Sequence, residues 1–246
     1  MNTLTVPHGE FLLERYPERK NAPLRAWDAA DGYLLRELHE TETLPQQQKC
    51  LIINDSFGLL SVALANLHPQ TMSDSYLAHL GTQNNLQKNN LSVDLIKYMT
   101  SLDQPDGPLD LVLIKIPKTL ALLEDQLHRI RPYLHAGTQI IGAGMVKGIH
   151  TSTLQLFERI IGPTHTSLAR QKARLIHCQF DSELNPGNSP YPSSYILEGT
   201  DYRIINHANV FSRERLDIGT RLFLEQVPSS LEPKRIIDLG CGNGIV

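Results

Sequence analysis

Residues 236–246 read IIDLGCGNGIV, in which an apolar run ends in an acid and is followed by three glycines. This order is typical of a buried strand that turns into a helix. Glycines at 240, 242 and 244 lack a Cβ atom, so backbone amides can approach a ligand closely. The spacing is GxGxG, and Ile245 stands where the third glycine of the dinucleotide fingerprint GxGxxG would be. The turn predicts an α/β fold and argues against a pyrophosphate cradle; a plain glycine-rich turn is the alternative interpretation.

Composition sets the broad class of the chain. With 246 residues, 41% of them hydrophobic, it can bury one α/β core and part of another. A formal net charge of −3 gives no global basic signature, so nucleic-acid contact needs a local patch. The cysteines at 50, 178 and 241 are isolated and lack metal-ligand spacing, which is typical of a reducing compartment. No export signal or long apolar run is present, so we expect a cytoplasmic protein without a membrane span or a metal site.

Apolar runs alternate with helical patterns along the first 180 residues. This alternation predicts a mostly parallel sheet with helices on both faces. The expected strands are 50–54, 71–74, 109–116, 139–142 and 173–180. The expected helices are 23–38, 58–67, 75–90, 118–131 and 151–161.

The composition changes to DSELNPGNSPYPSS between Asp181 and Ser194, which predicts a linker. We therefore divide the chain into an N-terminal domain over 1–180, a linker over 181–194 and the beginning of a second domain over 195–246. The second domain is expected to contain a hairpin of 195–197 with 202–205, a helix over 214–226 and a strand at 236–239. It would be cut after this first strand, and we expect it to be less stable than the first domain.

The first strand and its turn repeat the pattern of residues 236–244. Asn54 stands where position 238 has Asp, and Ser56 and Leu60 stand where positions 240 and 244 have glycine. Only Gly58 matches a glycine of the later copy. Side chains in place of two glycines predict that the first copy binds a cofactor poorly or not at all.

The glycine run with its leading acid resembles motif I of class I S-adenosylmethionine (SAM) methyltransferases. The whole chain resembles the bacterial ribosomal RNA guanine-N2 methyltransferases of the RsmC/RlmG family, most specifically in Asn206–Arg213, Leu216–Thr220 and the run at 236–244. Segments 113–127 and 149–158 look like the large-subunit branch of that family. The resemblance implies a degenerate class I SAM-methyltransferase domain with a Rossmann-like, parallel-rich α/β sheet, followed by the truncated start of a second such domain.

The resemblance also implies a reaction, which is SAM-dependent methylation of the exocyclic N2 of a guanine in large-subunit ribosomal RNA. Such a reaction depends on orienting the amine toward the methyl donor and on unstacking the base. In that family, an Asn-Pro-Pro-aromatic turn supplies the catalytic residues. This sequence contains no such turn, so we assign no catalytic residue and expect this chain to be inactive alone. The cofactor-binding residues that the resemblance implies are Phe211, Asp217, Gly219, Thr220, Asp238, Gly240, Gly242 and Gly244.

Two features of the first domain stand where such a fold has functional groups. Asp74 follows the second strand at the position of a ribose-binding acid, and a helix cap is an equally good interpretation. The run Lys115-Ile116-Pro117-Lys118 takes the place of the catalytic turn, with one matching proline.

Cations at strand ends and in loops are the candidates for contact with RNA. The alternation from 170 to 174 puts three cations on one face if the segment is extended. Solvated surface is the alternative interpretation for each cation. The candidates are Lys115, Lys118, Lys147, Arg170, Lys172 and Arg174.

The expected partner is large-subunit ribosomal RNA, and the oligomeric state stays open. A second hypothesis makes the chain a non-catalytic RNA-binding or pairing module. A third, a nicotinamide-dependent oxidoreductase, is disfavoured by Ile245.

Overall fold

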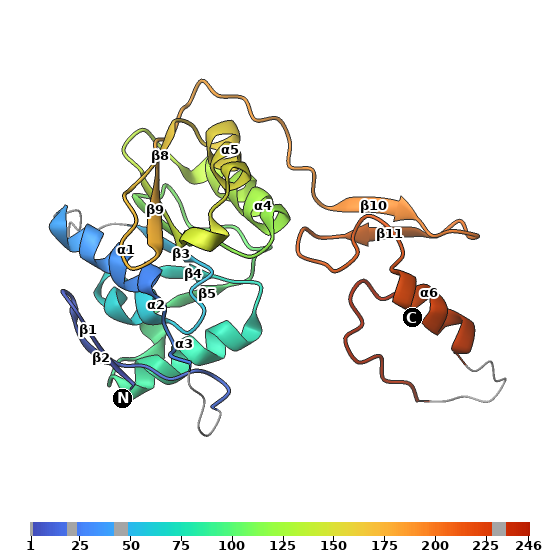
Figure 1. Ribbon diagram of the computed structural model, residues 1–246, viewed down its shortest axis with the longest axis horizontal. Coiled ribbons are helices and arrows are strands. Elements are labelled where there is room, and N and C mark those ends of the chain that lie inside the picture. The colour runs from blue at the N-terminus through green and yellow to red at the C-terminus, as the bar shows by residue number, and fades with distance from the viewer. Residues whose placement is uncertain (1, 19–23, 42–48, 228–234) are drawn as a thin grey trace. The chain divides into compact units, whose positions relative to one another are not determined.

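The computed structural model describes residues 2–18, 24–41, 49–227 and 235–246 (Figure 1). The chain separates into two compact units, Met1–Gly187 and Asn188–Val246. The division falls inside the linker that the sequence predicts at 181–194. In the described part of the chain, no helix has the length and apolar character needed to cross a membrane.

The N-terminal unit is built on a seven-stranded sheet with the strand order β5-β4-β3-β6-β7-β9-β8. The five strands from β5 to β7 are parallel, whereas β9 is antiparallel to β7 and β8 is antiparallel to β9. The strands are β3 (Cys50–Ile53), β4 (Gln70–Met72), β5 (Lys97–Met99), β6 (Leu111–Lys115), β7 (Gln139–Met145), β8 (Thr164–Thr166) and β9 (Ala173–Cys178). The predicted mostly parallel sheet is confirmed, and the chain order reverses between β3 and β6.

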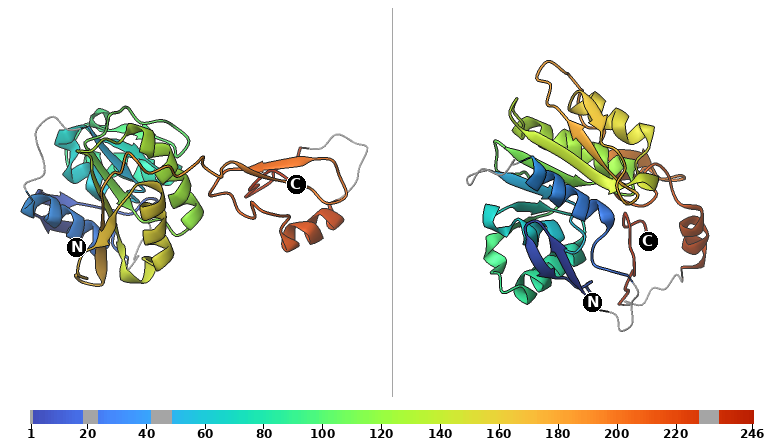
Figure 2. Two further views of the ribbon diagram at one scale, coloured as in Figure 1. Left: turned by 90° about the horizontal axis from the view of Figure 1, so that it is seen from above. Right: turned by 60° about the vertical axis from the view of Figure 1, so that its left-hand side comes forward.

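Helices cover both faces of this sheet (Figures 1 and 2). Because side chains alternate along a strand, Ile52 packs in the core on one face while Leu51 and Ile53 pack in the core on the other. The first core takes residues from α1 and α2, and the second takes residues from α4 and α5. The helices of this unit are α1 (Ala29–Glu40), α2 (Leu59–Ala63), α3 (Tyr76–Lys88), α4 (Leu120–Ile130) and α5 (Thr151–Ile160).

The capping residues of helices α1 and α3 differ from those that the sequence predicts. Helix α1 begins at Ala29 rather than at residue 23, because the Asp28 carboxylate caps it and accepts from the amides of Ala30 and Asp31; Pro23 itself lies outside the described residues. Helix α3 is capped by Ser75, whose hydroxyl accepts from the Ala78 amide, so Asp74 is not the capping residue.

Both units begin with a hairpin that is followed by a helix with an aspartate cap. In the N-terminal unit, the hairpin is β1 (Thr3–Val6) with β2 (Gly9–Leu12), which the sequence did not predict. In the second unit, it is the predicted hairpin, β10 (Ser193–Ile196) with β11 (Arg203–Asn206). Helix α6 (Ile218–Gln226) follows and starts after Asp217 rather than at residue 214, because the Asp217 carboxylate caps it. The internal repeat therefore extends beyond the strand and its turn.

The strand expected at 236–239 is absent. Ile236, Ile237 and Leu239 are 80%, 90% and 95% exposed, and the segment is irregular. A parallel strand exists only through hydrogen bonds to a neighbouring strand, and no described strand of this unit pairs with the segment.

The second unit is expected to open more readily than the first. Its buried hydrophobic residues, among those described, are Ala208 and Leu216, whereas every residue of β6 is buried. Amide hydrogens in β10 and β11 should therefore exchange at least about tenfold faster than those in β6. Hydrogen exchange followed by mass spectrometry measures this difference, and equal protection of both segments would contradict it.

Candidate functional site

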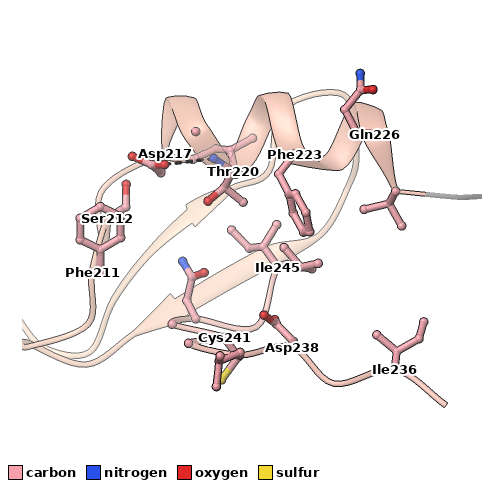
Figure 3. Close-up of a pocket in the computed structure, with 18 of the residues that line it drawn as sticks. Phe211, Ser212, Asp217, Thr220, Phe223, Gln226, Ile236, Asp238, Cys241 and Ile245 are labelled. Carbon is pink, nitrogen blue, oxygen red and sulfur yellow. Dashed lines mark hydrogen bonds between the residues drawn. The ribbon is translucent and has the colours of Figure 1, made fainter.

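The second unit contains a cavity of about 750 Å³ between α6, the loop before it and the segment 236–246 (Figure 3). Seven of the predicted cofactor-binding residues line it, and Gly244 does not. The seven are Phe211, Asp217, Gly219, Thr220, Asp238, Gly240 and Gly242. The structure thus brings together residues that are up to 31 positions apart in the sequence (211 to 242).

The glycines at 240, 242 and 244 all adopt left-handed backbone conformations, with φ of +80°, +56° and +73°. Residues that have a Cβ atom rarely adopt these backbone angles, so the turn favours glycine. A Cβ atom at position 240 or 244 would meet no atom within 4 Å, and one at position 242 would approach only the Gly240 carbonyl, at 3.9 Å. The backbone of this loop is therefore open to a molecule entering the cavity.

The segment Asp217–Thr220 has a structural explanation as well as a place at the cavity. The Asp217 carboxylate accepts a hydrogen bond of 3.0 Å from the Thr220 amide (Figure 3). A Cβ atom on Gly219 would lie 3.0 Å from Asp217 Oδ2, which is tighter than ordinary contacts. The Asp-x-Gly-Thr pattern hence fixes the start of α6, and the same carboxylate lies on the wall of the cavity.

Sequence reasoning missed several lining residues that share a face of α6. Phe223 and Gln226 follow Gly219 at intervals of four and seven residues, which places them on one side of the helix, and Val227 directly follows the last residue of α6. Helical spacing counted from Gly219 would have found the first two. Ile245 also lines the cavity, and Asn243 donates from Nδ2 to the Tyr195 hydroxyl at 3.4 Å, which ties the glycine loop to β10.

The N-terminal unit has its own cavity, of about 280 Å³, at the carboxyl ends of β3 and β6. The turn after β3, which lacks two of the three glycines of the later copy, lies at this cavity. Asn54, in the place of Asp238, pairs its amide with that of Gln126 through two hydrogen bonds of 2.9 Å. The Asp55 carboxylate accepts from the Gly58 and Ser61 amides at 3.2 and 2.8 Å, so an internal side chain occupies the amides that follow the turn.

Lys115, at the end of β6, is buried against two carboxylates beside this cavity. Its Nζ atom lies 2.8 Å from Asp28 Oδ1 and 2.5 Å from Asp31 Oδ1, and its side chain is 11% exposed. The ammonium could reach a phosphate only by moving away from both carboxylates. The carboxylates would then be charged, unpaired and poorly solvated, which is costly. The ion pairs therefore disfavour the predicted contact of Lys115 with RNA, and Lys115 holds α1 against β6.

Asp31 gives the N-terminal unit a dependence on pH. Burial raises the pKa of Asp31 to about 6, although Lys115 opposes the shift. A carboxyl whose folded pKa lies above its unfolded pKa stabilises the fold at low pH, and this contribution is lost as pH rises through the folded value. The free energy of unfolding should hence fall by on the order of 2 kcal/mol between about pH 4 and pH 7.

This slope should become shallower in Asp31→Asn, whose amide retains an oxygen to accept from the Asp28 amide. Urea unfolding at a series of pH values measures it, because Trp27 is the single tryptophan and lies in this unit. Burial also raises the pKa of Asp55, so Asp55→Asn is the companion variant. Identical slopes for the native protein and Asp31→Asn would contradict the prediction.

The other cations predicted to contact RNA lie along one edge of the sheet. Lys118 follows β6, Lys147 follows β7, and both side chains are exposed. Arg170 and Lys172 precede β9, but they are not on one extended face with Arg174, because Gln171 and Lys172 form a turn with φ of +50° and +62°. The condition of an extended segment, on which the shared face depended, is therefore not met. The turn nevertheless meets the Lys147 loop, since the Val146 amide donates to the Lys172 carbonyl at 2.8 Å.

The sheet order, the helix layers and the glycine turn define a Rossmann-like protein of the class I SAM-methyltransferase fold. Residues 1–182 match the family model of the RLMG N-terminal domain, and residues 201–246 match that of the methyltransferase small domain. The chain belongs to the ribosomal RNA large subunit methyltransferase G family.

Curated relatives carry that family name. The protein of Streptomyces griseus is 47% identical over 100% of this chain and 66% of its own length, and that of Pectobacterium atrosepticum is 48% identical over 100% and 64%. The chain thus spans slightly less than two thirds of the length of the curated relatives that it matches.

Two solved structures support the fold. A 16S rRNA N2 methyltransferase (RsmC) of T. thermophilus, solved in complex with AdoMet and guanosine, aligns with a TM-score of 0.58 at 17% identity, over 91% of this chain and 56% of that chain. A SAM-dependent methyltransferase of Agrobacterium tumefaciens aligns with a TM-score of 0.53 at 13% identity, over 72% and 69%. In the described residues, no group of three or more His, Cys, Asp or Glu could hold a metal ion.

Proposed function

We propose that this protein takes part in SAM-dependent methylation of the exocyclic N2 of a guanine in large-subunit ribosomal RNA. The observation that carries the proposal is the cavity of the second unit, where the Asp-capped helix and a three-glycine turn meet in a chain of this family. The solved T. thermophilus enzyme, a 16S rRNA N2 methyltransferase with AdoMet and guanosine, supports N2 of guanine as the acceptor.

The residues around the cavity fit SAM. The open space around the left-handed glycines suits a ligand that must lie against backbone, and the volume is within the range of cofactor pockets. Asp217 and Asp238 would face the charged and hydroxyl-bearing parts of SAM, while Phe223 and Ile245 supply apolar wall. When bound, SAM supplies an electrophilic methyl group; this chain contributes the walls that hold it.

The guanine amine is a weak nucleophile because its lone pair is delocalised into the ring, so its orientation must carry much of the rate. The family does this with an Asn-Pro-Pro-aromatic turn, and the 246 residues contain none. We therefore propose that the chain binds cofactor and RNA but does not transfer a methyl group by itself.

The test is a comparison of the 246-residue chain with the complete product of its gene. Both are titrated with SAM by calorimetry and then assayed for transfer of labelled methyl groups to large-subunit ribosomal RNA. We expect the complete product to bind SAM and to methylate a guanine at N2. Absence of SAM binding by the complete product would refute the proposal, and methyl transfer by the 246 residues alone would refute the claim that they are inactive.

A second candidate function is a non-catalytic RNA-binding or pairing module. The exposed cations along one edge of the N-terminal sheet favour it. RNA binding by a complete product that takes up no SAM would support this alternative.

A further inference from the structure

The N-terminal cavity lies at the point where an open parallel sheet most often binds ligands. The chain order reverses between β3 and β6, and the cavity is lined by the loop after β3 and by Lys115 at the end of β6. Its volume of about 280 Å³, against about 750 Å³ in the second unit, suits a single planar ring system rather than a whole cofactor.

The chemistry of this cavity disfavours a phosphate in its interior. Asp55 already accepts from the Gly58 and Ser61 amides, which are the groups that would otherwise hold an anion. Three carboxylates, those of Asp28, Asp31 and Asp55, line the cavity together with three cations, the Lys115 ammonium and the guanidinium groups of Arg15 and Arg25, so the lining has no net charge to attract an anion. The interior therefore favours a neutral group that donates hydrogen bonds.

Aromatic rings and guanidinium groups supply stacking surfaces in the same cavity. The Arg25 guanidinium lies 5.6 Å from the centre of the Trp27 ring, and the Arg15 guanidinium lies 4.7 Å from the centre of the Phe57 ring. Nucleobases stack on aromatic rings and on guanidinium planes alike. A nucleobase could extend either of these stacks, with its phosphate outside.

One carboxylate oxygen at the cavity is available to a ligand. Asp28 Oδ1 accepts from the Ala30 and Asp31 amides and from Lys115, whereas Oδ2 accepts from none of the described residues. The Asp28 side chain is 45% exposed. An exocyclic amine of guanine, adenine or cytosine would donate to this oxygen, whereas uracil presents carbonyl oxygens on both sides of its imino group and would be repelled.

The exposed cations lie at the same edge of the sheet as the cavity. Strands β6 and β7 are parallel, so their carboxyl ends share the edge, and Met145 at the end of β7 pairs with Ala173 at the start of β9. Lys118, Lys147 and Lys172 are consequently placed where the backbone of a nucleic acid whose base entered the cavity would pass.

We propose that the N-terminal cavity binds one unstacked nucleobase that carries an exocyclic amine, with stacking on the Arg25–Trp27 and Arg15–Phe57 pairs and a hydrogen bond to Asp28. The assignment of the base to single-stranded RNA rests on the proposed function. The base pocket itself needs neither SAM nor the second unit, so the two proposals can fail independently.

Trp27 makes the cavity directly observable, because it is the single tryptophan of the 246 residues and lines the cavity. The full chain is titrated with the 5′-monophosphates of guanosine, adenosine, cytidine and uridine, and with a short single-stranded RNA of mixed sequence, while tryptophan fluorescence is recorded. We expect saturable quenching by the amino-bearing nucleotides and about tenfold weaker binding of the uridine nucleotide.

Two variants and a matched control connect the signal to the pocket. Arg25→Gln and Phe57→Leu should each raise the dissociation constant about tenfold. Arg203→Gln removes a similarly exposed guanidinium from β11 in the other unit and should leave binding unchanged. Urea unfolding of each variant verifies that it is folded.

The two sources of the base give different results. Tighter binding of the RNA than of any mononucleotide supports an RNA base, whereas equal or tighter binding of a mononucleotide supports the pocket and assigns it to free nucleotides. Three results would overturn the proposal: no saturable quenching by any nucleotide or RNA, quenching that Arg25→Gln and Phe57→Leu both leave unchanged, or quenching by SAM alone. SAM uptake by the second unit has no bearing on these outcomes.

Discussion

Replacing Lys115 with alanine is expected to lower the free energy of unfolding of the N-terminal unit by about 3–5 kcal/mol. The change leaves the carboxylates of Asp28 and Asp31 next to each other without their shared ammonium, and Asp31 has a side chain only 9% exposed. Removing one partner of a buried ion pair costs more than the pair contributes, because the remaining charge cannot be solvated. Urea unfolding followed by Trp27 fluorescence measures the loss.

The controls separate the ion pair from the mere loss of a lysine. Lys118→Ala removes an exposed lysine three positions further on and should change stability by no more than about 0.5 kcal/mol. The double variant Lys115→Met with Asp31→Leu replaces charge by apolar volume and should recover most of the loss. The prediction fails if Lys115→Ala and Lys118→Ala unfold at the same urea concentration.

The contacts of Lys115 and Asp55 agree with the prediction that the first copy of the repeated turn binds a cofactor poorly or not at all. Each unit presents an aspartate at the start of the helix that follows its hairpin, Asp28 in one and Asp217 in the other. In the second unit this carboxylate lies on the wall of the larger cavity. In the first unit a lysine from β6 neutralises it, and Asp55 occupies the amides of the turn. Internal side chains thus engage Asp28 Oδ1 and the amides of the turn, and leave Asp28 Oδ2 to a smaller ligand.

Much of the fold could be predicted because its strands are fully buried. Parallel strands such as Cys50–Ile53 and Leu111–Lys115 are continuous apolar runs, which a sequence displays directly. The hairpin of Thr3–Val6 with Gly9–Leu12 was missed because its strands are mostly exposed and carry no such run. The segment 236–239 has the composition of a buried strand. A strand also needs a neighbouring strand to pair with, and composition does not reveal whether one is present.

The residues of the candidate site could be predicted where a local sequence pattern places them, and not where a distant contact does. The glycine turn and the cap at Asp217 are local patterns, so the residues that they place at the cavity could be named in advance. The ion pair of Lys115 with Asp28 joins positions 87 residues apart, and no local pattern indicates it. The turn at Gln171 and Lys172 was missed because neither residue is among those that favour positive φ.

Gly58→Ala is the second substitution with a large expected effect, a loss of about 2–5 kcal/mol in the free energy of unfolding of the N-terminal unit. Gly58 has φ of +86°, which alanine adopts only with strain. A Cβ atom there would lie 2.6 Å from the Thr82 Cα, so the turn after β3 would have to separate from α3. Because the nearest atom is backbone, adding Thr82→Gly should not restore stability, whereas Gly148→Ala, with no atom within 4 Å of its added Cβ, should be nearly neutral.

The same substitution in the second unit distinguishes two reasons for keeping a glycine. Gly242 corresponds to Gly58 in the repeat and also has positive φ, but an added Cβ would approach no atom closer than 3.9 Å. Gly242→Ala should therefore cost the second unit only the strain of a left-handed alanine, about 1–2 kcal/mol, and, in the complete gene product, weaken SAM binding. An equal loss of stability from both substitutions would mean that the glycine serves packing in both copies. If Gly58→Ala costs clearly more stability than Gly242→Ala, the glycine is required for packing in the first copy and for the close approach of a ligand in the second.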